Sequence, residues 1–353
     1  MMIMTPFSEK GNLMKETNFL IQKNKPSRPW LVFFSIAILF ILGCYLSLRF
    51  GAVAYTNQQV FSVLRAPLTD SDLQDVIFDL RLPRILAAIL VGAAMAQAGS
   101  IIQGVTRNPI ADPGLLGINA GAGLALMAGY AIFGSMHYSM TLLLCLIGAS
   151  LSACLIFGIS YHPQKGYQKT RLILAGAMIS TLFSSLGQAF SLYFDLSKAV
   201  IGWQAGGLAQ TNWKMLAIIA PFILVGLILA QLMAHQLTIL CLDEIVAKAL
   251  GQKTLATSIG LLSIVLILSA AAVALVGSLA FVGLIIPHFI KIFVARDYRI
   301  ILPLTAFAGS TFMLWVDLVC RTINPPVETP LSAIISIVGL PCFLWLVRKG
   351  ENL

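Results

Sequence analysis

The chain has 353 residues, of which 58% are hydrophobic and only 10% are charged. A soluble domain carries about 25% charged residues, so this composition excludes that class and predicts a protein with many membrane spans. The formal net charge of +9 does not indicate nucleic-acid binding. The basic residues stand at the ends of apolar runs and form no stripe with interleaved aromatic residues.

The N-terminal segment 1–29 is polar and basic, and it predicts a tail outside the membrane. The first apolar run, Trp30–Leu48, is too long for the core of a signal peptide. It has no small-residue cleavage site near its end, so we expect a retained first span. The remainder, 30–349, predicts a single membrane domain.

The count of spans follows from the apolar runs, because a helix needs roughly 20 apolar residues to cross the hydrocarbon core. The stretch from Leu255 to Val294 contains one charge, Lys291, and is too long for a single crossing, so we divide it near Gly277. With these two spans the total is ten, which predicts an all-α polytopic fold. The other eight runs are Trp30–Leu48, Ile85–Val105, Leu115–Phe133, Met140–Ser160, Leu172–Phe194, Trp213–Met233, Ile300–Val319 and Leu331–Val347.

The distribution of basic residues predicts the orientation in the membrane. An even number of spans puts both termini on one side. With the termini in the cytoplasm, 16 of the 23 Lys and Arg residues fall inside, as the positive-inside rule requires. This orientation places Arg81, Arg84 and Arg321 on the outer side.

The sequence contains no recognisable catalytic site. The fragment "ALGQKT" at 249–254 lacks the glycine pattern of a phosphate-binding loop. The four histidines are far apart, and the six cysteines show no CxxC spacing, so we expect neither a metal site nor a cofactor. Asp112, Asp195 and Asp317 fall near span ends, which gives an ion-coupled carrier little support. We therefore expect a non-enzymatic conduit powered by another protein.

Small residues and a polar break distinguish the stretch from 81 to 123. A Gly/Ala-rich helix containing Gly92 and Gly99 is followed by a break at Asn108 and Pro109. A second small-residue run then contains Gly117 and Gly121. Small residues let helix backbones approach closely, and irregular backbone at membrane depth must be buried in protein or line a cavity. Tight packing and the wall of a translocation path are both consistent with this pattern.

A short amphipathic helix is predicted on the cytoplasmic side at about 240–251, "LCLDEIVAKALG". Its apolar residues recur at helical spacing, with Asp243, Glu244 and Lys248 beside them. Such a helix lies either in the lipid headgroups or in the groove of a partner protein.

Eight motifs in a fixed order resemble the FecCD family, the permease subunits of ATP-binding-cassette importers for ferric siderophores, haem and vitamin B12. The resemblance extends from about residue 49 to the C-terminus. The motifs are "RLPR" from 81, "LVGAAMAQAGSIIQ" from 90, "RNPIADPGLLG" from 107, "RLILAG" from 171, "GWQAGGL" from 202, "LDEIVAKALG" from 242, "FVGLIIPH" from 281 and "VGLPCFLWL" from 338.

The resemblance implies a fold, a set of partners and a location. The family has ten membrane helices per subunit, and a second permease subunit, either an identical copy or a paralogue, completes the pathway. Two separate ATPase subunits hydrolyse ATP, and an extracytoplasmic binding protein delivers the substrate. The implied location is the bacterial cytoplasmic membrane. An iron–siderophore complex is the expected substrate, with haem or cobalamin as alternatives and an ion-coupled carrier as the competing mechanism.

The resemblance also assigns roles to residues. It implies that Arg81, Arg84 and Arg321 dock the binding protein through its glutamates, whereas anchoring in lipid headgroups is the alternative for these arginines. The loop before "RLILAG" matches the cytoplasmic gate, with Lys169 and Thr170 at its narrow point, although Lys169 is bulkier than the small hydroxyl residue expected there. The residues implied to couple to the ATPase are Asp243, Glu244, Ala247, Leu250 and Gly251.

Overall fold

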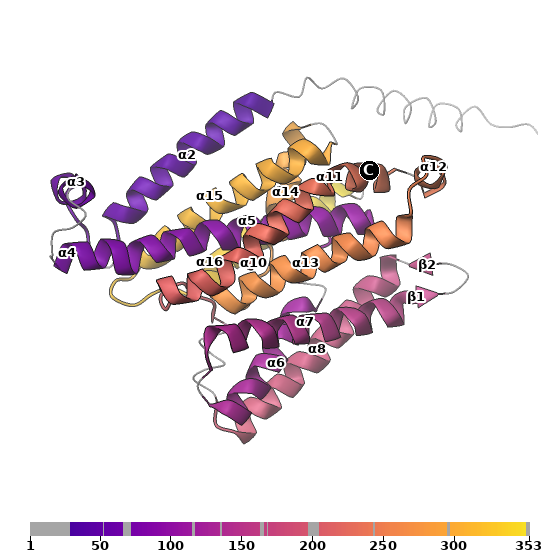
Figure 1. Ribbon diagram of the computed structural model, residues 1–353, viewed down its shortest axis with the longest axis horizontal. Coiled ribbons are helices and arrows are strands. Elements are labelled where there is room, and N and C mark those ends of the chain that lie inside the picture. Colours follow the sequence, from indigo (N-terminus) through magenta and orange to yellow (C-terminus); the bar gives the residue numbers. More distant parts are fainter. Residues whose placement is uncertain are drawn as a thin grey trace, which may run out of the picture.

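The computed structural model describes residues 29–51, 53–65, 72–114, 117–134, 136–162, 166–167, 169–196, 205–242, 244–294 and 297–350. Figure 1 shows a bundle of long helices. These are α2 (Pro29–Arg49), α5 (Leu82–Thr106), α6 (Ile118–Phe133), α7 (Tyr138–Ser160), α8 (Lys169–Tyr193), α10 (Trp213–Leu232), α13 (Thr254–Val276), α14 (Val282–Phe293), α15 (Tyr298–Thr322) and α16 (Leu331–Gly350). The short elements are α3 (Asn57–Arg65), α4 (Asp72–Asp75), the π-helix η1 (Val76–Arg81), α11 (Ala234–Leu240), α12 (Glu244–Ala249) and the strands β1 (Tyr161–His162) and β2 (Gly166–Tyr167).

Each of the ten predicted spans contains one long helix of the described chain. Among the described residues, six stretches have the length and hydropathy of a membrane span: α2, the continuous helix Asp72–Thr106, α7, α10, α13 and α15. Helices α6 and α14 are shorter, with 16 and 12 residues, and a third short apolar stretch, Leu331–Trp345, lies in α16. The chain is therefore a helical protein with several membrane spans, while the full count of ten crossings stays a prediction.

The long apolar stretch after residue 254 is divided where the sequence predicts. Helix α13 ends at Val276, and Gly277 has a φ of +86°, a left-handed conformation that favours glycine. The chain then runs without regular structure to Phe281 before α14 begins. The Asn119 amide donates to the Leu279 carbonyl, and the Gly207 N–H donates to the Val276 carbonyl at 2.9 Å. Both bonds satisfy backbone that is buried in the protein.

A proline accounts for the π-helix at the start of α5. Elements α4, η1 and α5 form one continuous helix of 35 residues. Pro83 has no N–H, so a regular helix cannot continue through it unchanged. The Leu82 N–H donates to the Ile77 carbonyl, five residues back. The Phe78 carbonyl, five residues before Pro83, instead accepts the indole N–H of Trp213 at 2.9 Å.

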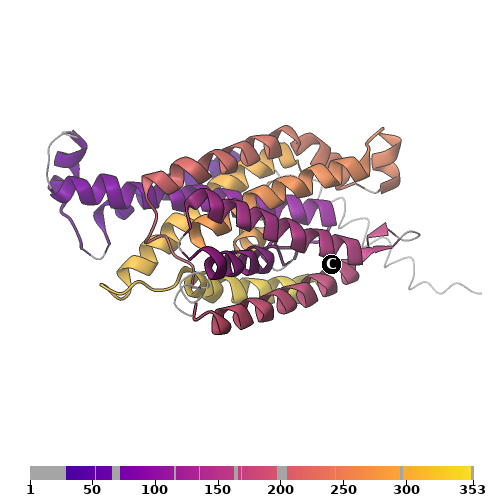
Figure 2. The ribbon, with the colours of Figure 1, turned by 60° about the horizontal axis from the view of Figure 1, so that its bottom comes forward.

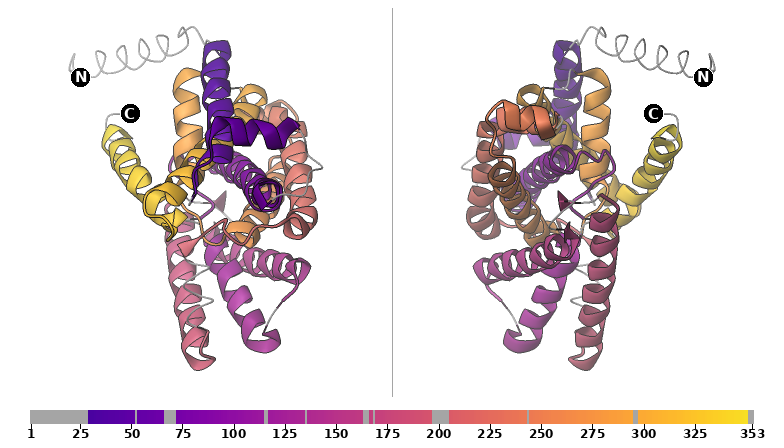
Figure 3. Two further views of the ribbon diagram at one scale, coloured as in Figure 1. Left: turned by 90° about the vertical axis from the view of Figure 1, so that its left-hand side faces the viewer. Right: turned by 90° about the vertical axis from the view of Figure 1, so that its right-hand side faces the viewer.

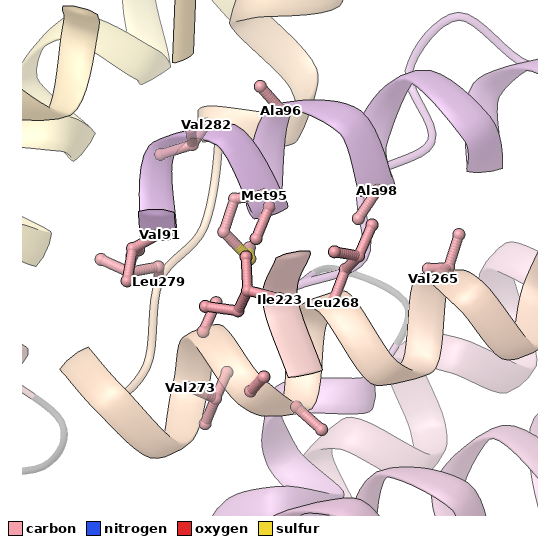
Figure 4. Close-up of a cluster of buried hydrophobic side chains, with 14 of the residues drawn as sticks. Val91, Met95, Ala96, Ala98, Ile223, Val265, Leu268, Val273, Leu279 and Val282 are labelled. Carbon is pink, nitrogen blue, oxygen red and sulfur yellow. The ribbon is translucent and has the colours of Figure 1, made fainter. Parts of the chain in front are cut away.

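Helix α5 forms the centre of the bundle. Its side chains pack against α10, α13 and α14, as Figure 4 shows for the cluster around Met95, Ile223 and Leu268. Two of its glycines mark close crossings: a Cβ on Gly92 would overlap the backbone of Gly309 in α15, and one on Gly99 would overlap that of Gly283 in α14. Without a hydrophobic driving force in lipid, such close backbone packing holds membrane helices together.

The two ends of the bundle carry different short elements. Figures 1 and 2 both place α3 and α4 at one end, and α12 with the β1–β2 hairpin at the other. The hairpin is antiparallel, with Tyr161 opposite Tyr167. Figure 3, which looks along the bundle, shows α6, α7 and α8 as a group to one side of the remaining helices.

Candidate functional site

Five charged side chains meet at the α3–α4 end, and we call them the arginine cluster: Arg81, Arg84, Asp317, Arg321 and Glu328. Arg81 and Arg84 come from the first part of the 35-residue helix, and Asp317 and Arg321 come from the last turns of α15. Glu328 lies in the exposed connection between α15 and α16. Residues three or four apart on a helix lie on neighbouring positions of one face, so the two members of each pair lie close together.

Arg84 connects the two carboxylates of the arginine cluster. Its Nε donates to Oδ1 of Asp317 at 2.8 Å. The outer edge of its guanidinium binds Glu328 in a bidentate fashion, with Nη1–Oε1 at 2.5 Å and Nη2–Oε2 at 3.0 Å. Bidentate, charge-assisted pairs of this kind are among the strongest hydrogen bonds in proteins.

Arg321 and Arg81 complete the arginine cluster and connect it to α2. Nε of Arg321 lies 3.1 Å from Oδ2 of Asp317, so this aspartate is shared by two arginines. Arg81 is held by main-chain oxygens: it donates to the Leu48 carbonyl and, at 2.6 Å, to the Val53 carbonyl. Its guanidinium also stacks 4.5 Å from the centre of the Tyr55 ring.

The sequence does not predict that the three arginines of the cluster are buried within the chain itself. We expected guanidinium groups free at an outer rim, but Arg81, Arg84 and Arg321 are only 6%, 8% and 6% exposed. A charge that deep needs a partner. Within the described chain, Asp317 supplies one to Arg84 and Arg321 at 1% side-chain exposure, whereas Arg81 is held by main-chain carbonyls. The side chain of Glu328 is 38% exposed, so it is the accessible member of the arginine cluster.

Helix α12 presents an apolar surface at the opposite end. Ile245 is 80% exposed and Leu250 is 62% exposed, whereas Ala247 is fully buried on the inner side. Gly251 ends the segment with a φ of +78° and has open space where a Cβ would be. Glu244 begins α12, but its side chain is outside the described residues, as is all of Asp243.

Arg107 fixes the segment that leads into α12, and our reading of the sequence gave it no such role. Its Nε and Nη2 both donate to the carbonyl of Leu240, the last residue of α11, at 3.1 and 3.0 Å. Its backbone is left-handed, with φ of 50°. After α12, the Gln252 amide donates back to the Gln236 carbonyl of α11 at 2.7 Å. The end of α5, α11 and α12 are thus bonded into one unit.

The predicted small and polar residues of the 81–123 stretch divide between packing and loop positions. A Cβ on Gly121 of α6 would overlap the backbone of Gly148 in α7. Gly117 has a φ of +80°, and its carbonyl accepts the hydroxyl of Ser152 at 2.7 Å. In the break after α5, the Asn108 side chain caps the Ile110 N–H at 3.2 Å, and Pro109 is exposed.

The predicted gate residues start α8 at the α12 end. Lys169 and Thr170 form its first turn, next to the β1–β2 hairpin, but their side chains lie outside the described residues. A second polar link on this side was not predicted: Lys291 donates to Gln103 Oε1 at 2.9 Å, and Gln103 Nε2 donates to the Gly283 carbonyl at 3.0 Å. No spacing in the sequence indicates that these residues meet, because 188 positions separate them.

Within the described residues, no three His, Cys, Asp or Glu side chains gather where they could hold a metal ion. Comparison with known proteins identifies the chain more directly. The FecCD transport family matches residues 39–349. The chain belongs to that family.

Relatives and a solved structure support the assignment to FecCD. The iron(3+)-hydroxamate import system permease protein FhuB of Bacillus subtilis is 36% identical over 314 residues, covering 89% of this chain and 82% of FhuB. The iron-uptake system permease protein FeuB of the same organism is 34% identical over 328 residues, covering 92% and 98% of the two chains. A metal-chelate type ABC transporter solved in an inward-facing conformation is 30% identical with a TM-score of 0.75, covering 91% of this chain and 99% of that one. This FecCD protein is accordingly a membrane permease.

Proposed function

We propose that this chain is the membrane-spanning permease subunit of an ATP-binding-cassette importer, and that its substrate is an iron–siderophore complex. The observation that carries the proposal is the match over residues 39–349 to FecCD, together with relatives named for iron-hydroxamate and iron uptake. ATP hydrolysis belongs to separate subunits, because the sequence has no phosphate-binding loop of its own.

The proposed ATPase contact is the surface of α12. An exposed apolar residue such as Ile245 is what a helix presents to a partner's groove. The proposed coupling residues are Asp243, Glu244, Ala247, Leu250 and Gly251. Ala247 is fully buried, so its proposed role is to support the helix from its inner side. In this arrangement, closing of two ATPase subunits on ATP moves α12 and shifts the permease between its conformations.

The proposed contact with a substrate-binding protein is the arginine cluster. Arg81, Arg84 and Arg321 outnumber the two carboxylates there, so the cluster carries an excess positive charge that favours an acidic partner surface. A second permease subunit, identical or paralogous, completes the pathway between these two contacts. The helix crossings at Gly92, Gly99 and Gly121 hold together the helices of this pathway, and the segment with Asn108, Pro109 and Gly117 lies beside it. Lys169 and Thr170 form its cytoplasmic gate.

The proposed location is the bacterial cytoplasmic membrane, with α12 and both termini in the cytoplasm. Labelling of single cysteines tests this orientation. Leu80 lies in η1, directly after α4, and Ile245 lies in α12. Helices α4 and α12 stand at opposite ends of the bundle (Figure 1), and both residues are exposed, so each is replaced by cysteine in a chain without its native cysteines. In intact cells a membrane-impermeant maleimide should label the first and not the second. Labelling of both positions from outside would contradict the orientation.

Uptake by a deletion strain tests the substrate. Cells lacking the gene, with and without a plasmid copy, are given radioactive iron as ferric hydroxamate or ferric citrate, and separately haem or radiolabelled cobalamin. We expect loss of uptake of one ferric chelate and its restoration by the plasmid. If only haem or cobalamin uptake were lost, that compound would be the substrate in place of a ferric chelate. Unchanged uptake of every compound would contradict the transport role. Uptake abolished by an ionophore at normal ATP levels would favour an ion-coupled carrier instead.

A further inference from the structure

One carboxylate of the arginine cluster is placed differently from the other. Asp317 is enclosed between α5 and α15, with a side-chain exposure of 1%, and two arginines share it. Glu328 contacts Arg84 alone among the ion pairs of the described residues, and its side chain is 38% exposed. One carboxylate is therefore structural, whereas the other closes the cluster from outside.

The connection that carries Glu328 has few attachments to the helices. Ile323 and Val327 are 59% and 64% exposed. In this described connection, the Thr329 N–H donates to the Cys320 carbonyl at 3.1 Å. Displacing Glu328 therefore disturbs little packed structure, in contrast to Asp317, which lies within a helix.

The position of Glu328 is one that a carboxylate from another protein can take. Arg84 uses Nε for Asp317, so its Nη1–Nη2 edge is the part that Glu328 covers. That edge is the planar fork that matches a carboxylate. If Glu328 leaves without a replacement, a buried guanidinium loses a counter-charge, which is costly. An anion that takes its place restores this counter-charge.

We infer that Glu328 is an exchangeable stand-in for a carboxylate of the docking partner. In the free permease it occupies the outer edge of Arg84. On docking, an acidic side chain of the partner takes this edge and Glu328 moves into water. This inference rests on the proposed function, since it requires docking at the arginine cluster. It adds that the permease itself competes with its partner for Arg84 and so limits the affinity of docking.

The test compares three variants in the assembled transporter, reconstituted in lipid nanodiscs. Glu328→Gln removes the competing charge. Glu328→Asp keeps the charge but shortens the side chain, so the bidentate contact weakens. Asp79→Asn removes one charge from an exposed position on η1, outside the arginine cluster, and controls for the general electrostatic field. The probe is the substrate-binding protein that supports uptake through this permease, and its Kd is measured by surface plasmon resonance.

We expect Glu328→Gln to tighten binding by roughly two- to fivefold, which is the upper part of the range that one exposed ion pair contributes. Glu328→Asp should tighten it in the same direction, and Asp79→Asn should change it by less than about twofold. The proposal that Glu328 exchanges with a partner carboxylate is overturned if Glu328→Gln raises the Kd, or if its Kd equals that of Asp79→Asn. It is also overturned if Glu328→Asp binds like the unmodified transporter. If the unmodified transporter does not bind the protein, docking at this surface fails and the exchange fails with it.

Discussion

Nε of Arg84 lies 2.8 Å from Oδ1 of Asp317, although 233 positions separate the two residues in the chain. Both side chains are buried, and they join the start of α5 to the end of α15. The same aspartate also lies beside Arg321. The ends of two helices that also cross at Gly92 and Gly309 are thus held by one carboxylate.

Asp317→Asn should destabilise the protein strongly. Removing one partner of a buried ion pair costs about 3–5 kcal/mol, because the remaining charge keeps its desolvation penalty. Here Arg321 loses its carboxylate partner, and Arg84 keeps only the more exposed Glu328. The thermal unfolding midpoint of the detergent-purified protein should fall well below that of Glu328→Gln, which alters a half-exposed carboxylate. Equal midpoints for the two variants would contradict the structural role of Asp317.

Gly99→Ala should also destabilise the protein, because the added methyl group would overlap the backbone of Gly283. Overpacking of this kind costs about 1–3 kcal/mol, and backbone atoms cannot move aside as a flexible side chain can. Gly158→Ala is the matched control, since that helical glycine has nothing within 4 Å of a Cβ position. Thermal unfolding should separate the two variants. If both behave alike, the crossing of α5 and α14 is looser than described.

The sequence predicts the helices well and their contacts poorly. Hydropathy locates α2, α7 and α13 to within a few residues, because a helix is the structure that satisfies backbone groups in lipid. The break after Val276 is predicted by Gly277. The burial of Arg84 could not be predicted, because its partners Asp317 and Glu328 become neighbours only through tertiary packing.

Two features of the sequence do indicate part of the arginine cluster. Asp317 and Arg321 are four residues apart on one helix, which is the spacing of an intrahelical ion pair. An acidic residue inside an apolar run also requires a partner. By contrast, nothing in the sequence indicates that Arg107 binds the Leu240 carbonyl, since every residue presents a carbonyl. Contacts to backbone carry no sequence signature on the acceptor side.

Arg107→Ala should uncouple the ATPase from transport. The variant loses two hydrogen bonds from a charged group to Leu240, and such bonds contribute about 1.5–3 kcal/mol. Because Leu240 ends α11, four residues before α12 begins, we expect basal ATP hydrolysis to remain, while stimulation by the binding protein and uptake both fall severalfold. Arg299→Ala is the control, as it removes the same charge from an exposed position at the start of α15. Normal stimulation in Arg107→Ala would show that the bonds from Arg107 to Leu240 do not transmit movement between the ATPase and the helices.

Ile245→Asp should abolish assembly with the ATPase and leave the fold intact. The side chain is 80% exposed, so a charge there costs the isolated chain little, but it cannot enter an apolar groove. Co-purification with a tagged ATPase subunit measures assembly, and gel filtration of the permease alone measures folding. Val53→Asp, at 59% exposure in the α3–α4 end, is the control. Retention of the ATPase by Ile245→Asp would place the contact elsewhere.

The continuous helix from Asp72 to Thr106 has 35 residues, so at a rise of 1.5 Å per residue it measures about 52 Å. A bilayer is about 40–45 Å thick with its headgroups. The helix is therefore longer than the membrane that it crosses, even when it is modestly tilted. At least one of its ends therefore extends beyond the lipid headgroups as regular helix. A protein that approaches the membrane at that end contacts this helix before it contacts the bilayer.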